Sequence, residues 1–79
     1  MNIYEVSIST VCPVNGQPVD LYITIKTKNV VMVETLLLFL EDLKNNLHED
    51  LADRLYKKFG GKQVVKGFHH GVWITTERG

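Results

Sequence analysis

The sequence has little cysteine, little proline and no net charge, and each shortage narrows the classes of protein it can belong to. Its 79 residues include one cysteine and two prolines, while nine acidic residues balance nine Lys and Arg. One cysteine cannot form an internal disulfide, which is typical of a reducing compartment. The balanced charge argues against a nucleic-acid binder driven by phosphate neutralisation, although a local basic patch is compatible with it.

Long apolar segments are missing as well. The longest apolar run, around residues 30–40, is interrupted by Glu34 and is too short to span a bilayer. The opening residues MNIYE show neither the basic flank nor the apolar block of a secretory signal. We therefore expect a cytoplasmic protein without a membrane partner.

The length and composition fit one globular domain over residues 1–79. Hydrophobic residues make up 44% of the chain and charged residues 23%, which is ordinary for a folded protein. A domain of this size buries only about 60% of the surface of its unfolded chain, so it is marginally stable alone. Self-association is a usual remedy, and we expect a homo-oligomer.

Alternation of apolar and polar residues predicts four strands. Residues 4–9 and 21–26 alternate with the period of a half-buried strand. The segment between them contains both prolines, and it predicts an antiparallel hairpin with a long loop. Residues 62–68 and 72–76 predict two further strands, joined by a turn at residues 69–71.

Helical spacing of apolar residues predicts two helices between the hairpins. The first stripe consists of Val33, Leu36, Leu37, Leu40 and Leu43. Leu38 and Phe39 lie off this stripe, so the helix is apolar on more than one face, which suggests burial against another subunit. The second stripe runs along residues 47–59, and Gly60 and Gly61 end it.

The element order β-β-α-α-β-β predicts an α+β domain. Its two hairpins would form one four-stranded antiparallel sheet, with both helices on one face. The other face would carry Tyr22, Thr24, Trp73 and Thr75. This face is too mixed to be a core, and it is suited to lining the interior of a larger assembly.

Cys12 lies in the loop of the first hairpin, and Asp20 follows it eight residues later. A thiol at a strand end with an acid nearby is an arrangement for nucleophilic chemistry with a proton donor. The alternative is that this lone cysteine is a small buried hydrophobe.

Three further residues at the predicted helix starts could contribute to a site, His48 as a catalytic residue and Glu49 and Glu34 in binding a substrate. His48 and Glu49 open the second helix, where Glu49 could accept the paired N–H and amino groups of a guanine-like base. The alternative is a capping box between Asn46 and Glu49. Glu34 interrupts an apolar run, and it is either a ligand or an ordinary first-turn acid favoured by the helix dipole.

A metal site is not expected. His69 and His70 are adjacent and point to different sides of a strand or turn, and no local spacing matches a zinc site. A zinc site built from His48, one of these two histidines and Cys12 is the remaining alternative.

Three stretches resemble the 7-cyano-7-deazaguanine reductase family (QueF) and the related QueF-like amidinotransferases. They are residues 12–18 (CPVNGQP), residues 33–35 (VET) and residues 47–50 (LHED). The resemblance implies a T-fold, or tunnelling fold, which assembles into barrels with active sites between subunits. It covers about residues 9–50.

The resemblance also implies a reaction on the nitrile of 7-cyano-7-deazaguanine. Cys12 would form a covalent thioimide and Asp20 would supply the proton, while Glu49 binds the base with His48 beside it. Glu34 would contribute from a neighbouring subunit. The reductase reduces the thioimide with NADPH in queuosine biosynthesis, whereas the QueF-like branch uses ammonia to make the amidine of archaeosine in tRNA.

Two departures affect these expectations. The reductase motif Glu-Ser-Lys-Ser is here Glu34-Thr35-Leu36-Leu37, which lacks the lysine and serine associated with NADPH and so favours the amidinotransferase branch. The aspartate of the family comes seven residues after the cysteine, where this chain has Val19. Asp20 therefore reaches the site only if the loop absorbs one residue.

Two alternatives stay open beside the nitrile-processing enzyme. One is a T-fold protein that binds a purine or pterin without turnover, and the other is a pterin or GTP-cyclohydrolase type of enzyme. The substrate of the nitrile reaction could be a free 7-deazaguanine or a base within tRNA.

Overall fold

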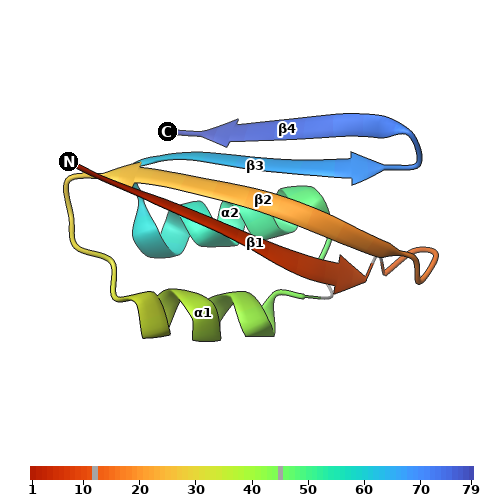
Figure 1. Ribbon diagram of the computed structural model, residues 1–79, viewed down its shortest axis with the longest axis horizontal. Helices are drawn as coiled ribbons and strands as arrows, with labels where there is room; N and C mark the ends of the chain where they lie inside the picture. The colour runs from red at the N-terminus through yellow and green to blue at the C-terminus, as the bar shows by residue number, and fades with distance from the viewer. Residues whose placement is uncertain (12, 45) are drawn as a thin grey trace.

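The computed structural model describes residues 1–11, 13–44 and 46–79, and these form the expected order of elements. The elements are β1 (Asn2–Val11), β2 (Pro18–Thr27), α1 (Val33–Asp42), α2 (His48–Phe59), β3 (Lys62–His69) and β4 (Val72–Arg78). Figure 1 shows the two helices beside a long, narrow sheet. The α+β prediction is confirmed.

The strands form one antiparallel sheet in the order β1-β2-β3-β4. The β3–β4 turn consists of His70 and Gly71, which have φ angles of 50° and 86°. Two positive φ values are the mark of a type I′ turn, whose twist matches that of the flanking strands. The turn therefore fixes the register of this hairpin, in which His69 pairs with Val72.

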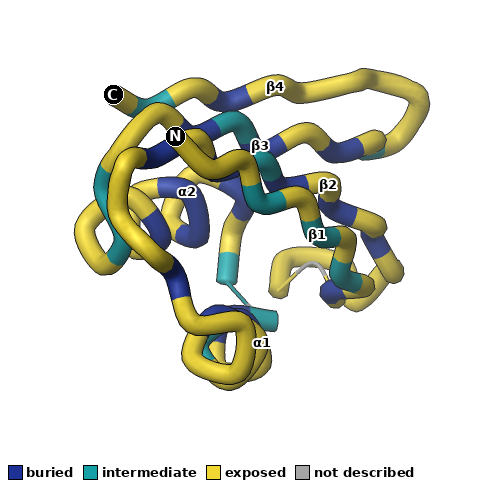
Figure 2. Tube along the Cα trace, turned by 60° about the vertical axis from the view of Figure 1, so that its left-hand side comes forward, coloured by how far each residue is buried: buried dark blue, intermediate teal, exposed yellow. Residues whose placement is uncertain are grey.

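Both helices cover the same face of the sheet, as expected (Figure 2). Every second residue of β2 points into the core, with Leu21, Ile23 and Ile25 almost fully buried. These side chains line up across the sheet, because Ile23 pairs with both Val6 and Val65. The helices contribute Leu36, Leu40, Leu51, Ala52 and Leu55 to the same core, and Leu43, the C-cap residue of α1, joins them.

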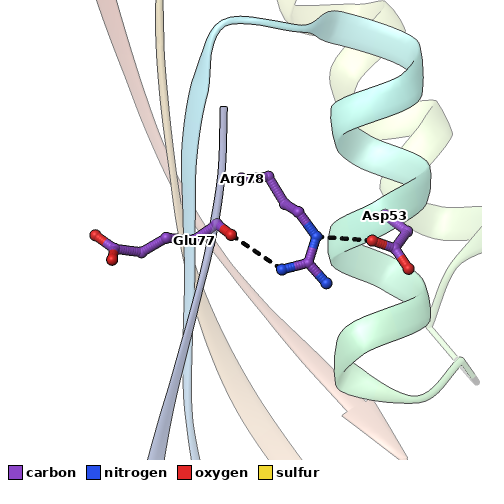
Figure 3. Close-up of polar contacts among 3 residues, drawn as sticks. All are labelled: Asp53, Glu77 and Arg78. Carbon is purple, nitrogen blue, oxygen red and sulfur yellow. Dashed lines mark hydrogen bonds and ion pairs between the residues drawn. The ribbon is translucent and has the colours of Figure 1, made fainter.

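Polar contacts tie α2 to the second hairpin. The amide nitrogen of Gln63 donates to the carbonyl oxygens of Leu55 (3.0 Å) and Gly60 (2.8 Å), so a strand residue satisfies carbonyls at the end of the helix. Arg78 of β4 donates from Nε to the Asp53 carboxylate at 2.7 Å (Figure 3). The Asp53 side chain is 62% exposed, so we assign this ion pair a small share of the stability.

The first helix differs in part from the expectation. Leu36 and Leu40 are buried, but Val33 and Leu37 of the expected stripe are 55% and 50% exposed. Leu38 is more exposed still. The buried strip of α1 is thus narrower than the apolar pattern, and the helix presents apolar side chains to its surroundings.

The opposite face of the sheet carries the four residues expected there. Thr24 is half-buried, and the exposed rings of Tyr22 and Trp73 lie 6.3 Å apart between centroids, with the Lys66 ammonium 4.8 Å from the Trp73 ring. Within the described part of the chain, no helix is long and apolar enough to cross a membrane.

Candidate functional site

A cavity of about 330 Å³ lies where α2 begins, beside the end of β1 and the start of β2. Its apolar lining consists of Pro13, Val19, Leu21, Leu47 and Ile74. Its polar lining consists of Thr10, Asn46, His48, Glu49, Asp50 and His69. A cavity that combines apolar walls with polar side chains is typical of small-molecule sites.

Gly67 makes room for the histidines at this cavity. It pairs with Leu21 on one side and Ile74 on the other, so it belongs to the row of side chains under the cavity. A Cβ atom at this position would lie 2.5 Å from Cδ2 of Leu21, 2.9 Å from Nε2 of His69 and 3.3 Å from Nδ1 of His48. The glycine therefore allows the two imidazoles to approach the strand closely.

The first turn of α2 supplies the carboxylates. The N-cap residue is Leu47, and no side-chain capping hydrogen bond is found among the described residues. The alternative of a capping box between Asn46 and Glu49 is therefore wrong, because Asn46 lies one residue before the cap and its backbone N–H donates to Leu43 instead. Glu49 is exposed and lines the cavity, where the helix dipole favours its negative charge.

His48 is held firmly from both sides of its ring. Its Nε2 lies 3.0 Å from the Val65 carbonyl oxygen, so this nitrogen must carry a proton and donate it. Its Nδ1 lies 3.0 Å from Nε2 of His69. Burial lowers the pKa of His48 below 6.5 and the nearby His69 adds to this, while the hydrogen bond to Val65 and the charge of Glu49 act against it. His48 is therefore favoured in its neutral form.

The neutral state of His48 determines the role of His69. Since the proton of His48 is on Nε2, its Nδ1 accepts, and the Nε2–H of His69 must be the donor. His69 is half-buried at the cavity, and its ring centroid lies 5.2 Å from that of His48. The sequence around His69 suggested only a metal ligand, and it does not reveal this contact, which joins residues 21 positions apart.

Cys12 lies outside the described residues, but its loop can be followed on either side. The next residue, Pro13, lines the cavity, and Thr10 before it donates from its hydroxyl to the Val19 carbonyl oxygen at 3.1 Å. Further along, the Asn15 side chain binds the backbone N–H of Gln17 and the ring of His70. The loop is thus tied to the β3–β4 turn.

Asp20 lies on the other face of the sheet. The pairing of β1 with β2 is continuous, with Thr10 opposite Val19 and Ser9 opposite Asp20. Val19 therefore points to the cavity, and Asp20 accepts a hydrogen bond from the Ser9 hydroxyl at 2.7 Å on the opposite face. The loop does not absorb the extra residue, so within one chain Asp20 is not brought together with His48 and Glu49.

Glu34 is also remote from the cavity in a single chain. It is exposed in the first turn of α1, which begins at the same end of the long axis as the chain termini, whereas α2 begins towards the other end (Figure 1). Its alternative role as a first-turn acid therefore agrees with its position.

The described residues contain no group of three or more His, Cys, Asp or Glu side chains that could hold a metal ion. His69 contacts His48 under α2, while His70 contacts Asn15 in the loop, so the adjacent histidines diverge.

The order of elements, the four-stranded antiparallel sheet and the two helices on one face together define a T-fold domain. Among solved structures, the chain is similar to the archaeosine synthase QueF-Like in its apo form, with a TM-score of 0.67 and 17% sequence identity. The match covers 98% of this chain and 89% of that one. No protein-family model matches the chain, and neither does any curated protein. At this identity the likeness establishes the fold.

Proposed function

We propose that this domain is an enzyme that binds a 7-deazaguanine in the cavity at the start of α2 and acts on its nitrile through Cys12. One observation carries the proposal: Glu49 and Pro13, the neighbour of Cys12 in the sequence, line the same cavity. A base-binding carboxylate and the loop of a nucleophile thereby meet at one small site. The T-fold shared with an archaeosine synthase supports this reading.

The lining of the cavity suits a purine-like base. The carboxylate of Glu49 would accept hydrogen bonds from the ring N–H and the exocyclic amino group, a charge-assisted pair with bidentate geometry. Val19 and Leu21 offer apolar contacts to the ring system. His48 lines the cavity, but both its ring nitrogens are bonded within the chain. We therefore assign it the role of positioning His69.

The chemistry would proceed by addition and then displacement. The sulfur of Cys12 forms a bond to the nitrile carbon, one C–N π bond breaks and the nitrogen gains a proton, which gives a thioimide. Ammonia then adds to the thioimide carbon and the thiol leaves, which gives an amidine. Both steps balance without a redox cofactor.

The environment of α1 supports the amidinotransferase branch over the NADPH-dependent reductase. The position of the lysine in the reductase motif is taken by Leu36, which is buried in the core. A buried leucine cannot bind the phosphates of NADPH. Glu34 would reach a cavity only from another copy of the chain, as expected of a homo-oligomer with sites between subunits.

The test is the intact mass of the protein after incubation with 7-cyano-7-deazaguanine, for the wild type and for Cys12→Ala. We expect an added substrate mass on the wild type alone, discharged by ammonium and not by NADPH. Discharge by NADPH would reverse the choice of branch. No adduct on the wild type, with the free base or with tRNA carrying the base, would refute the proposal.

A non-catalytic binder of purines or pterins is the second candidate, and the position of Asp20 favours it. Asp20, the expected proton donor, lies on the face of the sheet opposite the cavity. A site that only binds its ligand needs no proton donor and would tolerate this position. Saturable binding of 7-deazaguanine without an adduct would support this candidate. Zinc in the purified protein, bound in a one-to-one ratio, would instead favour a cyclohydrolase type of enzyme.

A further inference from the structure

The proposed addition requires a proton at the nitrile nitrogen, and the residue expected to provide it lies elsewhere. Asp20 is hydrogen-bonded to Ser9 on the face of the sheet opposite the cavity. Among the described residues, the titratable side chains that line the cavity are His48, Glu49, Asp50 and His69. Within one chain, one of these has to replace Asp20 if the reaction takes place in the cavity.

Three of the four are poor candidates. His48 donates from Nε2 to a fixed backbone carbonyl and accepts at Nδ1, so neither nitrogen is available to a substrate. Glu49 has the role of binding the base. Both carboxylates lie in the first turn of α2, where the helix dipole favours a negative charge over an acid that could donate a proton.

His69 is the remaining candidate, and its imidazole ring is oriented by a hydrogen bond to His48. A chain of hydrogen bonds runs from the Val65 carbonyl to His48 Nε2–H, and from His48 Nδ1 to His69 Nε2–H. The second bond fixes the tautomer of His69, so that in the neutral ring Nδ1 is the nitrogen that can accept a proton. A base whose ring is oriented by a second group is the usual design of acid–base catalysis.

We propose that His69 carries the proton between the Cys12 thiol and the nitrile nitrogen, with His48 as its positioning residue. The inference depends on the proposed function. In this step Nδ1 of His69 takes the thiol proton as the S–C bond forms, and gives it to the nitrile nitrogen as the C–N π bond breaks. The proton gained equals the proton lost, and His69 returns to its neutral form.

The groups that face His69 agree with this role. On the side of α2 it contacts neutral His48, and Glu49 and Asp50 line the same cavity, where their negative charges stabilise the transient imidazolium. On the side of β4 its strand partner is the uncharged Val72. Gly67 leaves the space in which the pair of rings lies.

The experiment compares His69→Gln with wild type and with the control Arg54→Gln, at an exposed position of α2 that is not among the residues lining the cavity. A glutamine at position 69 can still donate to Nδ1 of His48, but it cannot exchange a proton. The rate constant for adduct formation with 7-cyano-7-deazaguanine is measured by mass spectrometry from pH 5.5 to 8. Binding of the unreactive 7-deazaguanine is measured by calorimetry.

We expect His69→Gln to lower the rate constant about 100-fold or more and to remove its pH dependence in the range where an imidazole titrates. The dissociation constant of 7-deazaguanine should change less than threefold, and Arg54→Gln should react within threefold of wild type. A His69→Gln rate within threefold of wild type would overturn the inference and leave the proposed function intact. Absence of an adduct on the wild type would remove both.

A spectroscopic test covers the case in which His69→Gln does not fold. Imidazole ¹⁵N spectra of the wild-type protein at neutral pH should show both His48 and His69 as tautomers protonated at Nε2. A His48 ring protonated at Nδ1 would contradict the assigned roles.

Discussion

At the scale of single residues, the buried ring of His48 couples folding to pH. Burial lowers its pKa in the folded protein below 6.5, a value typical of the unfolded chain. As the pH falls through about 6.5, the unfolded chain therefore takes up this proton first. The free energy of unfolding should decrease as the pH falls from 7 towards 5, and should not change on this account above about 7.5.

The measurement is urea unfolding at several pH values for wild type and His48→Gln. The variant is less stable at neutral pH, because a glutamine amide does not reproduce the positions of both ring nitrogens, which bond Val65 and His69. What matters is the slope, which should be shallower between pH 5 and 7 than in wild type. Equal slopes in the two proteins would show that His48 does not carry this linkage.

The residue scale is also where the sequence was least informative. A shift of one residue in the register of β2 would exchange the faces of the sheet on which Val19 and Asp20 lie. Only the unbroken pairing of β1 with β2 decides which of them points to the cavity. His69 became a candidate through its contact with His48, which depends on the packing of α2 over β3. Gly67 allows that packing, and no motif in the sequence around it indicates this role.

At the scale of elements, the sequence predicted more. The strands and helices follow from local periodicity and from glycines at their ends, and Gly60, with a φ of 66°, ends α2 as expected. The start of α2 could not be predicted in the same way. The Asn46 backbone N–H donates to Leu43 in the connection between the helices, a contact that the spacing of Asn46 and Glu49 does not reveal.

The end of α2 depends on Gln63, a residue of β3. Gln63 is 2% exposed, and its amide donates to carbonyl oxygens at the C-terminal end of the helix. Gln63→Ala removes both hydrogen bonds and leaves the carbonyl of Leu55 in the core without this partner. We expect a loss of about 2 kcal/mol or more in the free energy of unfolding, measured by urea denaturation.

Gln17→Ala is the matched control for this change. Gln17 is exposed in the β1–β2 loop, where its backbone and not its side chain binds Asn15. Its substitution should change the free energy of unfolding by about 0.5 kcal/mol or less. If the two variants were equally stable, the side chain of Gln63 would not hold the helix end.

At the scale of the whole molecule, the apolar surface exceeds what one copy of the chain can bury. Along α1 and the segment before it, Val30, Met32, Val33, Leu37 and Leu38 are all at least half exposed. The opposite face of the sheet exposes Tyr22, Phe68 and Trp73. A domain of about 80 residues buries only a limited part of its apolar surface on folding. Apolar surfaces of this kind are therefore expected to contact another chain.

We therefore predict that the protein self-associates at micromolar concentration and that α1 takes part in the contact. Leu37→Lys should weaken association about tenfold or more, because a lysine ammonium would be desolvated in an apolar contact. Asp42→Lys is the matched control: it places the same side chain on α1 about 140° around the helix axis, at 3.6 residues per turn. Sedimentation equilibrium separates the outcomes, since wild type and Asp42→Lys should keep the same assembled mass while Leu37→Lys shifts towards the monomer. A wild type that stays a folded monomer would contradict the prediction. It would also leave Glu34 without a route to a cavity, because the cavity of its own chain lies towards the other end of the molecule.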